Sequence, residues 1–205
     1  MSDLPSFLRD RSSYGLLPWS AQFAASQSFS KSVAEVESVA LENELLPARY
    51  QRNRAMLSLE NQRRLFASHV AVIGCGGLGG YVLEQLARLG VGRITAIDPD
   101  CFEEHNLNRQ LFSSIGNLGQ PKVAAVVERL GRINPAVTVR ACQEAFGLDN
   151  GEGLLQGADA VVDCLDNVTI RLELAEVCTL LGVPLVHGAI GGWYGHVCSG
   201  LAGGL

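Results

Sequence analysis

The chain contains 205 residues, of which 47% are hydrophobic and 18% are charged. This length allows one α/β domain with a sizeable core and a modest extension. The formal net charge of −5 leaves no basic field to hold a phosphate backbone, which argues against a general nucleic-acid binder.

The cysteines and the apolar segments argue against a zinc protein, a secreted protein and a membrane-spanning protein. No two cysteines form a C-x-x-C pair, so we expect no zinc site, and their scatter predicts reduced thiols in a cytoplasmic protein. No signal peptide is evident at the N-terminus. Residues 177–205 are uncharged, but glycines and a proline interrupt them, so no membrane-spanning helix is expected. The cysteines are Cys75, Cys101, Cys142, Cys164, Cys178 and Cys198.

The first 46 residues differ in character from the rest. Residues 1–30 are rich in serine with scattered aromatic side chains, which predicts an irregular or disordered leader. In residues 32–46, apolar side chains recur at helical spacing, which predicts a short helix that ends before Pro47. A helix that docks a partner is the alternative. We therefore predict an extension over residues 1–46 and an α/β domain over residues 47–205.

From Pro47 onward, apolar strand-like runs alternate with helical patterns. This alternation predicts a Rossmann-like, doubly wound and mainly parallel sheet. Because such sheets bind ligands outside the carboxyl ends of their strands, the polar residues at those ends should converge on one crevice. The predicted strands cover residues 69–73, 93–97, 137–141, 160–164 and 184–187. The predicted helices cover residues 58–66, 81–89, 121–133 and 169–181.

A glycine-rich loop follows the first predicted strand of the sheet and opens a helix. Residues 74–79 read GCGGLG and fit the pattern G-x-G-x-x-G. Glycines allow a tight turn and close backbone approach, and the free N–H groups at the start of a helix attract phosphate. Asp98 ends the next strand, where a carboxylate can accept hydrogen bonds from ribose hydroxyls. These features predict a nucleotide site that would also suit a nicotinamide-dependent dehydrogenase. The glycines of the pattern are Gly74, Gly76, Gly77 and Gly79.

Two basic residues distinguish between these activities. Arg109 lies in segment 106–110, which reads NLNRQ, and Lys122 ends segment 119–122, which reads GQPK. A guanidinium and an ammonium group at the phosphate end of a nucleotide neutralise the charge that builds on a transferring phosphate and on leaving pyrophosphate. Hydride transfer needs no such pair, so the sequence favours phosphoryl or nucleotidyl transfer.

The fourth predicted strand ends in acidic residues, since residues 163–167 read DCLDN. Asp166 can hold Mg²⁺ on a triphosphate, because Mg²⁺ prefers one or two carboxylates plus substrate oxygens. Asn167 also suits the N-terminus of the following helix as a cap.

In their order and spacing, these motifs resemble the ThiF/MoeB/HesA family of adenylyltransferases, the bacterial relatives of ubiquitin-activating enzymes. The resemblance covers residues 47–197 and includes residues 49–53, which read RYQRN. It departs mildly at Asn53, where the family often has glutamine.

The resemblance implies a role for each matching residue. Gly77 and its neighbours would lie against the nucleotide, and Asp98 would hold the ribose. Asp166 would bind Mg²⁺, with Asn167 beside the nucleotide. Arg52 matches an arginine that reaches the ATP of the other subunit, which implies a homodimer with shared active sites. Contacts to the phosphates would come from Asn106, Asn108, Arg109 and Lys122.

The activity implied by the resemblance is ATP-dependent adenylation of a ubiquitin-like sulfur-carrier protein that ends in Gly-Gly. The carrier's ionised carboxylate attacks the α-phosphate and pyrophosphate leaves, so positioning and electrostatics supply the catalysis. The pathway would be sulfur transfer in thiamine or molybdenum/tungsten cofactor assembly, with no membrane or nucleic-acid partner. The catalytic residues would be Arg52, Arg109, Lys122 and Asp166.

Family members usually continue well past the position of residue 205, with a second half of the sheet that pairs with the carrier. Residues 198–205 lack charge and strand-like alternation where the family continues as a strand. We therefore expect a truncated or frameshifted product whose last strand is an exposed apolar sheet edge. Carrier binding and full activity would then be impaired.

Three other functions fit parts of the sequence. An ATP-dependent tRNA-base dehydratase of the same superfamily shares the motifs, but segments 106–110 and 119–122 look more like the sulfur-carrier branch, and the pI near 5.4 argues against tRNA binding. A non-catalytic nucleotide-binding remnant or scaffold would fit a missing second half. An NAD-dependent oxidoreductase is disfavoured by Arg109 and Lys122.

Overall fold

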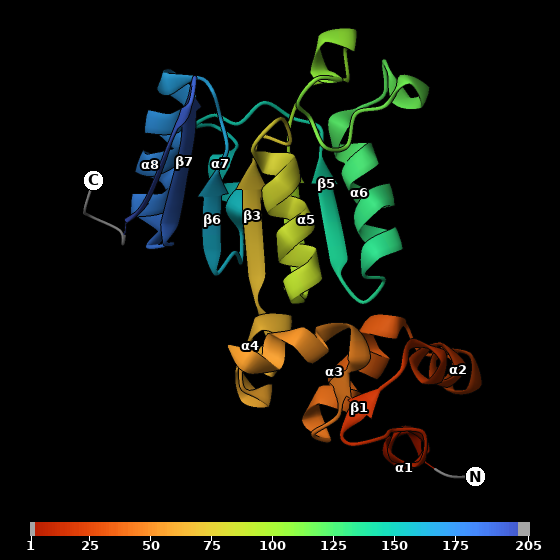
Figure 1. Cartoon of the computed structure of the whole chain (residues 1–205). Helices are drawn as coiled ribbons and strands as arrows, with labels where there is room; N and C mark the ends of the chain where they lie inside the picture. The colour runs from red at the N-terminus through yellow and green to blue at the C-terminus, as the bar shows by residue number, and fades with distance from the viewer. Residues whose placement is uncertain (1–2, 201–205) are drawn as a thin grey trace.

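The computed structural model describes residues 3–200 and shows an α/β domain with a helical extension at its N-terminal side (Figure 1). The domain is built on a six-stranded sheet with the order β5-β4-β3-β6-β7-β8. Strands β3 to β7 run parallel to one another, and β8 runs antiparallel to β7. The strands are β3 (His69–Ile73), β4 (Arg93–Ile97), β5 (Thr138–Cys142), β6 (Ala160–Asp163), β7 (Leu185–Gly191) and β8 (Tyr194–Gly200).

Helices cover both faces of this sheet (Figure 1). In β3, Val70 and Val72 pack into the core beneath α5 and α6, whereas Ala71 and Ile73 pack into the core beneath α7 and α8. Successive side chains of a strand point to opposite faces, so a strand covered on both faces is apolar throughout. The predicted doubly wound, mainly parallel sheet is confirmed. The helices are α5 (Gly79–Leu89), α6 (Lys122–Ile133), α7 (Gly151–Leu155) and α8 (Val168–Leu181).

The strand register brings the predicted site residues to one edge of the sheet. Ile73, the last residue of β3, pairs with Ile97 of β4 and with Asp163 of β6. Beyond these residues, Gly74 N donates to Ile97 O (2.9 Å) and Cys164 N donates to Ile73 O (2.9 Å). The carboxyl ends of the three central strands therefore lie side by side, as the alternation of strands and helices predicted.

The N-terminal extension corrects an expectation. Residues 3–30, expected to be irregular, form two helices and a short strand, while residues 1–2 lie outside the described residues. Leu8, Ala25, Val36 and Ala40 are fully buried where three short helices meet. The three helices have 7, 11 and 10 residues, and helices this short are marginal alone in water, so their order depends on packing against one another. The elements are α1 (Leu4–Asp10), β1 (Leu16–Leu17), α2 (Trp19–Phe29), α3 (Val33–Glu42) and β2 (Leu46–Pro47).

The helix expected over residues 32–46 is α3, which starts where predicted and ends sooner. Ser32 and Glu35 form a reciprocal cap, because Ser32 Oγ accepts from Glu35 N and Glu35 Oε2 accepts from Ser32 N. Glu44 has a φ of +60°, outside the right-handed helical region, so the helix ends at Glu42.

A buried polar network joins the extension to the α/β domain. Glu37 of α3 is fully buried and accepts hydrogen bonds from Arg49 and from Tyr50 Oη (2.7 Å). Asn134, which follows α6, donates to Tyr50 Oη (2.6 Å). Arg49 and Tyr50 belong to η1 (Ala48–Ala55), so this network holds η1 against the domain. Helix α4 (Leu59–Ala67) follows, close to the range predicted, and the boundary at residues 46–47 stays a prediction.

The last strand corrects a second expectation. Residues 198–200, expected to break the strand, belong to β8, in which His196 pairs with Ala189 of β7. Residues 201–205 lie outside the described residues. Because β8 is the outermost strand and Tyr194 and Val197 are largely exposed, its residues need not alternate between buried and exposed positions. Within residues 3–200, no helix combines the length and the apolar character needed to cross a bilayer.

Candidate nucleotide site

The glycine loop lies between β3 and the start of α5. A Cβ added at Gly79 would lie 1.7 Å from Gly74 O, and one added at Gly74, whose φ is +92°, would lie 2.8 Å from Cys164 O. Glycine is therefore required at both positions for the loop to close. At Gly76 and Gly77, the nearest atoms to an added Cβ are 3.5 and 3.7 Å away. At these two glycines the side chains of Gln110 and Arg109 lie in ordinary van der Waals contact with the place of the missing Cβ.

Asp98 follows β4 and is almost fully buried. Its Oδ2 accepts a hydrogen bond from Cys75 N of the glycine loop (2.7 Å), and its Oδ1 accepts from Asp100 N (2.9 Å). Burial raises the pKa of Asp98, and these two hydrogen bonds and the charge of Lys122 oppose that rise. A carboxylate offers about four lone-pair positions, so Asp98 keeps acceptor capacity for a ribose hydroxyl.

Lys122 begins α6 and is also almost fully buried. Its Nζ lies 2.7 Å from Asp100 Oδ2 and 3.9 Å from Asp98 Oδ1. A buried ammonium group needs such partners, because an isolated charge is costly away from water. The structure thus brings Lys122 to Asp98, and through it to the glycine loop. Its contact with a phosphate stays a prediction.

Arg109 also lies against the glycine loop. Its Cγ is 3.7 Å from the position that a Cβ would take at Gly77. Its Nη1 donates to His105 O (3.0 Å) and to Asn108 Oδ1 (3.2 Å), and the side chain is exposed. A positive charge is therefore exposed beside the loop, and its contact with a phosphate stays a prediction.

Gln110 is a site residue to which the sequence assigned no role. It is almost fully buried, and its Nε2 lies 3.5 Å from the position that a Cβ would take at Gly76. Among the described residues, its Oε1 has no hydrogen-bond partner. A buried acceptor without a donor costs about 1–3 kcal/mol. The amide group of Gln110 therefore lies against the loop through its Nε2, with its Oε1 buried behind.

The two asparagines of the segment differ in their surroundings. Asn106 is buried, and its Oδ1 accepts from Glu103 N (2.9 Å), which closes the turn η2 (Glu104–Asn106). Asn108 is exposed beside Arg109. The phosphate contacts implied for both stay predictions. A second turn, η3 (Ile115–Asn117), precedes Lys122.

Asp166 and Asn167 lie at the carboxyl end of β6, and both are exposed. Asn167 Oδ1 accepts from Thr169 N (2.9 Å) and Ile170 N (3.2 Å), which confirms the predicted cap of α8. Within residues 3–200, no group of three or more His, Cys, Asp or Glu side chains could hold a metal ion. Mg²⁺ on a nucleotide needs only one or two carboxylates, and the oxygens of Asp166 are donors of the kind it prefers.

Arg52 lies away from the glycine loop of its own chain. It is exposed on η1, where the neighbouring Asn53 Nδ2 donates to Leu89 O (3.3 Å) at the far end of α5. The glycine loop lies at the N-terminal end of α5, whereas Leu89 is its last residue. A helix of 11 residues is about 16 Å long, so this length separates η1 from the loop. Figure 1 accordingly shows the extension and the glycine loop at opposite ends of the sheet.

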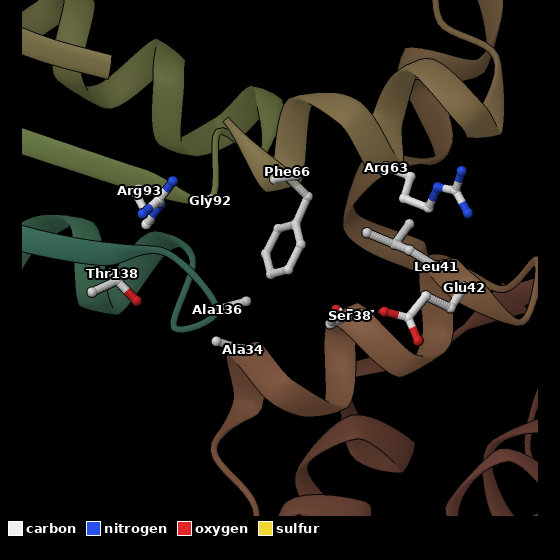
Figure 2. A pocket seen from close by; sticks show the side chains of 11 residues that line it. Ala34, Ser38, Leu41, Glu42, Arg63, Phe66, Gly92, Arg93, Ala136 and Thr138 are labelled. Carbon is white, nitrogen blue, oxygen red and sulfur yellow. Dashed lines mark hydrogen bonds between the residues drawn. The ribbon is translucent and has the colours of Figure 1, made fainter. Parts of the chain in front are cut away.

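A hollow of about 430 Å³ lies elsewhere, where the extension meets the amino end of the sheet. Figure 2 shows Leu41 of α3, Phe66 of α4 and Thr138 of β5 around it. It shares no residue with the glycine loop or with the side chains grouped around it. The candidate nucleotide site is therefore defined by its backbone loop and its charges and not by this cavity.

Comparisons with known proteins show the family to which the chain belongs. A profile of the ThiF family matches residues 50–201. The chain is 38% identical over 144 residues to the SAMP-activating enzyme E1 of Haloferax volcanii, covering 69% of this chain and 53% of the relative. It is 38% identical over 143 residues to the molybdopterin-synthase adenylyltransferase of Salmonella typhimurium (69% and 57% covered). It is 38% identical over 151 residues to the sulfur carrier protein adenylyltransferase of Thermus thermophilus (73% and 56% covered).

A solved structure also resembles the fold. It is the E. coli tRNA N6-threonylcarbamoyladenosine dehydratase in complex with ATP, with a TM-score of 0.68 and 31% identity, covering 71% of this chain and 61% of that one. The chain spans little more than half the length of the three curated relatives. It belongs to the ThiF family, which confirms the resemblance inferred from the motifs.

Proposed function

We propose that this chain binds ATP with Mg²⁺ and adenylates the C-terminal glycine carboxylate of a ubiquitin-like sulfur-carrier protein. The observation that carries the proposal is the grouping of Asp98, Lys122 and Arg109 around a glycine loop in a member of the ThiF family. Two curated relatives named adenylyltransferases support the reaction type, and one of them is named for a sulfur carrier protein. A solved relative that holds ATP supports the nucleotide.

The proposed reaction is a displacement at the α-phosphorus of ATP. A carboxylate oxygen of the carrier forms the new O–P bond, and pyrophosphate leaves with the electron pair of the bond that breaks. The carboxyl group of a chain terminus is ionised at neutral pH, so no protein base is needed. Arg109 and Lys122 would neutralise the charge that builds on the phosphates. Mg²⁺ held by Asp166 would add charge neutralisation on the triphosphate.

The remaining residues would hold the nucleotide. The glycine loop would present its backbone N–H groups to the phosphates, with the start of α5 behind it. Asp98 would accept hydrogen bonds from the ribose. The buried Oε1 of Gln110 would accept a hydrogen bond from the ligand. Further contacts are assigned to Asn106, Asn108 and Asn167.

Arg52 would act across a homodimer. Its own glycine loop lies a helix length away, at the opposite end of α5, which exceeds the reach of one arginine side chain. An arginine of a second copy could approach the open side of the site instead. Shared active sites in a homodimer would give this exposed arginine a function.

The pathway proposed is sulfur transfer in thiamine or molybdenum/tungsten cofactor assembly. The names of the molybdopterin-synthase and sulfur-carrier relatives support it. We place the reaction in the cytoplasm, because all six cysteines are free and disulfides are rare in that compartment.

A second candidate is ATP-dependent dehydration of a tRNA base. The TM-score of 0.68 and 31% identity to a tRNA N6-threonylcarbamoyladenosine dehydratase favour it. The net charge of −5 disfavours it, because tRNA binding rests largely on basic side chains. Both candidates use ATP, so nucleotide binding alone does not separate them.

The deciding experiment is ATP–pyrophosphate exchange by the purified chain with a sulfur carrier that ends in Gly-Gly. The matched control is the same carrier without its last glycine. Exchange that occurs with the intact carrier and not with the shortened carrier supports carrier adenylation. ATP hydrolysis that requires tRNA, without exchange, selects the dehydratase. ATP binding with neither activity would leave a nucleotide-binding protein and overturn the proposed reaction for this chain.

A further inference from the structure

A chain of three polar side chains lies beside the candidate nucleotide site, and the proposed function leaves it unused. Asp163 ends β6 and is fully buried, and its Oδ2 lies 2.5 Å from His187 Nδ1 on β7. His187 Nε2 lies 2.7 Å from Arg171 Nη1 on the first turns of α8. The guanidinium also lies 4.0 Å from Asp163 Oδ2. The three side chains therefore form a continuous network between two strands and a helix.

The chemistry of the network sets the protonation of the histidine. A guanidinium group donates hydrogen bonds and accepts none, so His187 Nε2 must be the acceptor from Arg171. His187 Nδ1 then carries the ring proton and donates a hydrogen bond to Asp163 Oδ2. A neutral imidazole thus connects a carboxylate to a guanidinium, and the two opposite charges compensate each other away from water.

The same network holds the backbone of Leu165 at both of its polar atoms. Asp163 Oδ1 accepts from Leu165 N (2.9 Å), and Arg171 Nη2 donates to Leu165 O. Arg171 Nη2 also donates to Gly188 O (3.0 Å), which ties this loop to β7. Leu165 directly precedes Asp166, and on the other side Asn167 is fixed by its cap on α8. The exposed carboxylate of Asp166 is therefore carried on a backbone that is held on both sides.

We infer that Arg171 is a positioning residue that aims Asp166 at the Mg²⁺ of a bound nucleotide, acting through the backbone of Leu165. The inference rests on the proposed function, in which Asp166 is the Mg²⁺ ligand. A buried ion pair contributes little net stability compared with apolar residues of the same size. Its use here is to set one geometry for a loop whose next residue faces solvent.

The test is equilibrium binding of ATP to the full chain, titrated with Mg²⁺ and repeated in EDTA. The variants are Arg171→Lys, Asp166→Ala and the double variant. Lysine keeps the charge but lacks the planar fork that reaches Leu165, Gly188 and His187 together. We expect Arg171→Lys to weaken the apparent Mg²⁺ affinity about tenfold or more, the usual scale for residues that orient a metal ligand. ATP binding in EDTA should be unchanged.

The double variant distinguishes positioning from general stability. If Arg171 acts through Asp166, adding Arg171→Lys to Asp166→Ala should cause no further loss, because the two effects are not independent. If Arg171→Lys lowered the Mg²⁺ affinity of the Asp166→Ala chain as much as it lowers that of the unaltered chain, Arg171 would have a general structural role and the inference would be overturned. Weaker ATP binding in EDTA would lead to the same conclusion. Unchanged Mg²⁺ affinity in Arg171→Lys would also overturn it.

Two further measurements keep the outcomes separate. Failure of the unaltered chain to bind ATP more tightly with Mg²⁺ than in EDTA would reject Asp166 as a Mg²⁺ ligand and the inference with it. If Arg171→Lys does not fold, Arg171→Gln replaces it, since glutamine is shorter and uncharged and removes the contacts to Leu165 O and Gly188 O. The same loss of Mg²⁺ affinity, with faster amide exchange at Leu165, is then expected, and an unchanged Mg²⁺ affinity overturns the inference.

Discussion

The side chain of Arg109 lies along the backbone of Gly77, with its Cγ 3.7 Å from the place of the missing Cβ. The glycine leaves room for the arginine, and the arginine leaves its charge exposed beside the loop. The sequence alone linked these residues only through the order of motifs. Their contact joins the segment that carries Arg109 to the glycine loop, and it leads directly to a test of catalysis.

Arg109→Ala should lower the rate of adenylation by at least about 10²-fold, the usual scale for removing a positioned electrostatic stabiliser. The free energy of unfolding should change little, because the side chain is exposed. Carrier-dependent ATP–pyrophosphate exchange and urea unfolding measure the two effects. Arg132→Ala is the matched control, since Arg132 is an exposed arginine that pairs with Glu128 on α6, and it should leave exchange unchanged. An unaltered rate in Arg109→Ala would reject this phosphate site.

The glycines of the loop should respond differently to alanine. Gly79→Ala places a Cβ 1.7 Å from Gly74 O, so the backbone must move and both folding and ATP binding should suffer. A Cβ at Gly76 makes only an ordinary contact with Gln110 Nε2, at 3.5 Å, so Gly76→Ala should fold. It should bind ATP more weakly, because the proposed site needs the ligand close to the loop backbone. Thermal unfolding and ATP titration measure these effects.

Gly131→Ala on α6 is the control for the glycine series. No atom lies within 4 Å of an added Cβ there, and alanine favours a helix over glycine by about 1 kcal/mol. It should raise stability slightly and leave ATP binding as it is. If Gly76→Ala bound ATP as tightly as the unaltered chain, the loop would not be the phosphate cradle.

The central strands could be predicted from sequence because each is a short apolar run bounded by residues that break strands. The ranges 69–73 and 93–97 match β3 and β4 residue for residue. The sequence also predicted that Asp98 and Lys122 lie close together, since parallel strands end at the same edge of the sheet. Helix α5 starts two residues before the predicted 81 because Gly79 and Gly80 form its first turn.

Other features depend on contacts between distant segments. Helix α7 has five residues, two of them glycine, so its helical propensity is low, and burial of Leu154 and Leu155 holds it in place. The extension folds because three short helices pack together, which no local pattern shows. The burial of Gln110 Oε1, without a hydrogen-bond partner among residues 3–200, and the distance of Arg52 from its own loop are likewise results of packing.

A cluster at α5 and α6 predicts a pH dependence of stability. Glu84 accepts hydrogen bonds from Arg129 (3.0 and 3.1 Å) and from Arg88 (2.7 and 3.0 Å). The hydrogen bond from Arg129, followed by that from Arg88, lowers the pKa of Glu84 below its ordinary 4.5 in spite of desolvation. The ionised form is therefore favoured in the folded chain. Its stabilisation is present above pH 4.5 and is lost as the pH falls through the lower, folded-state pKa.

Glu84→Gln should thus be less stable than the unaltered chain at pH 7, by about 1 kcal/mol because both arginines are half exposed. The difference should shrink as the pH falls below 4.5. Urea unfolding at pH 7 and at lower pH measures it, with Glu128→Gln on the exposed face of α6 as the control that changes little. A difference that grew with falling pH would contradict the assignment.

Arg52 provides the test of shared sites. Arg52→Ala and Asp166→Ala should each be inactive in exchange, because one lacks the arginine donated to the partner and the other lacks the Mg²⁺ ligand. Mixed and allowed to exchange subunits, they should recover up to about a quarter of normal activity per total site, since random pairing makes half of the dimers mixed and each mixed dimer has one intact site. Arg54→Ala, on the same turn, is the control and should stay active alone. If the mixture forms heterodimers and remains inactive, Arg52 serves its own subunit or none.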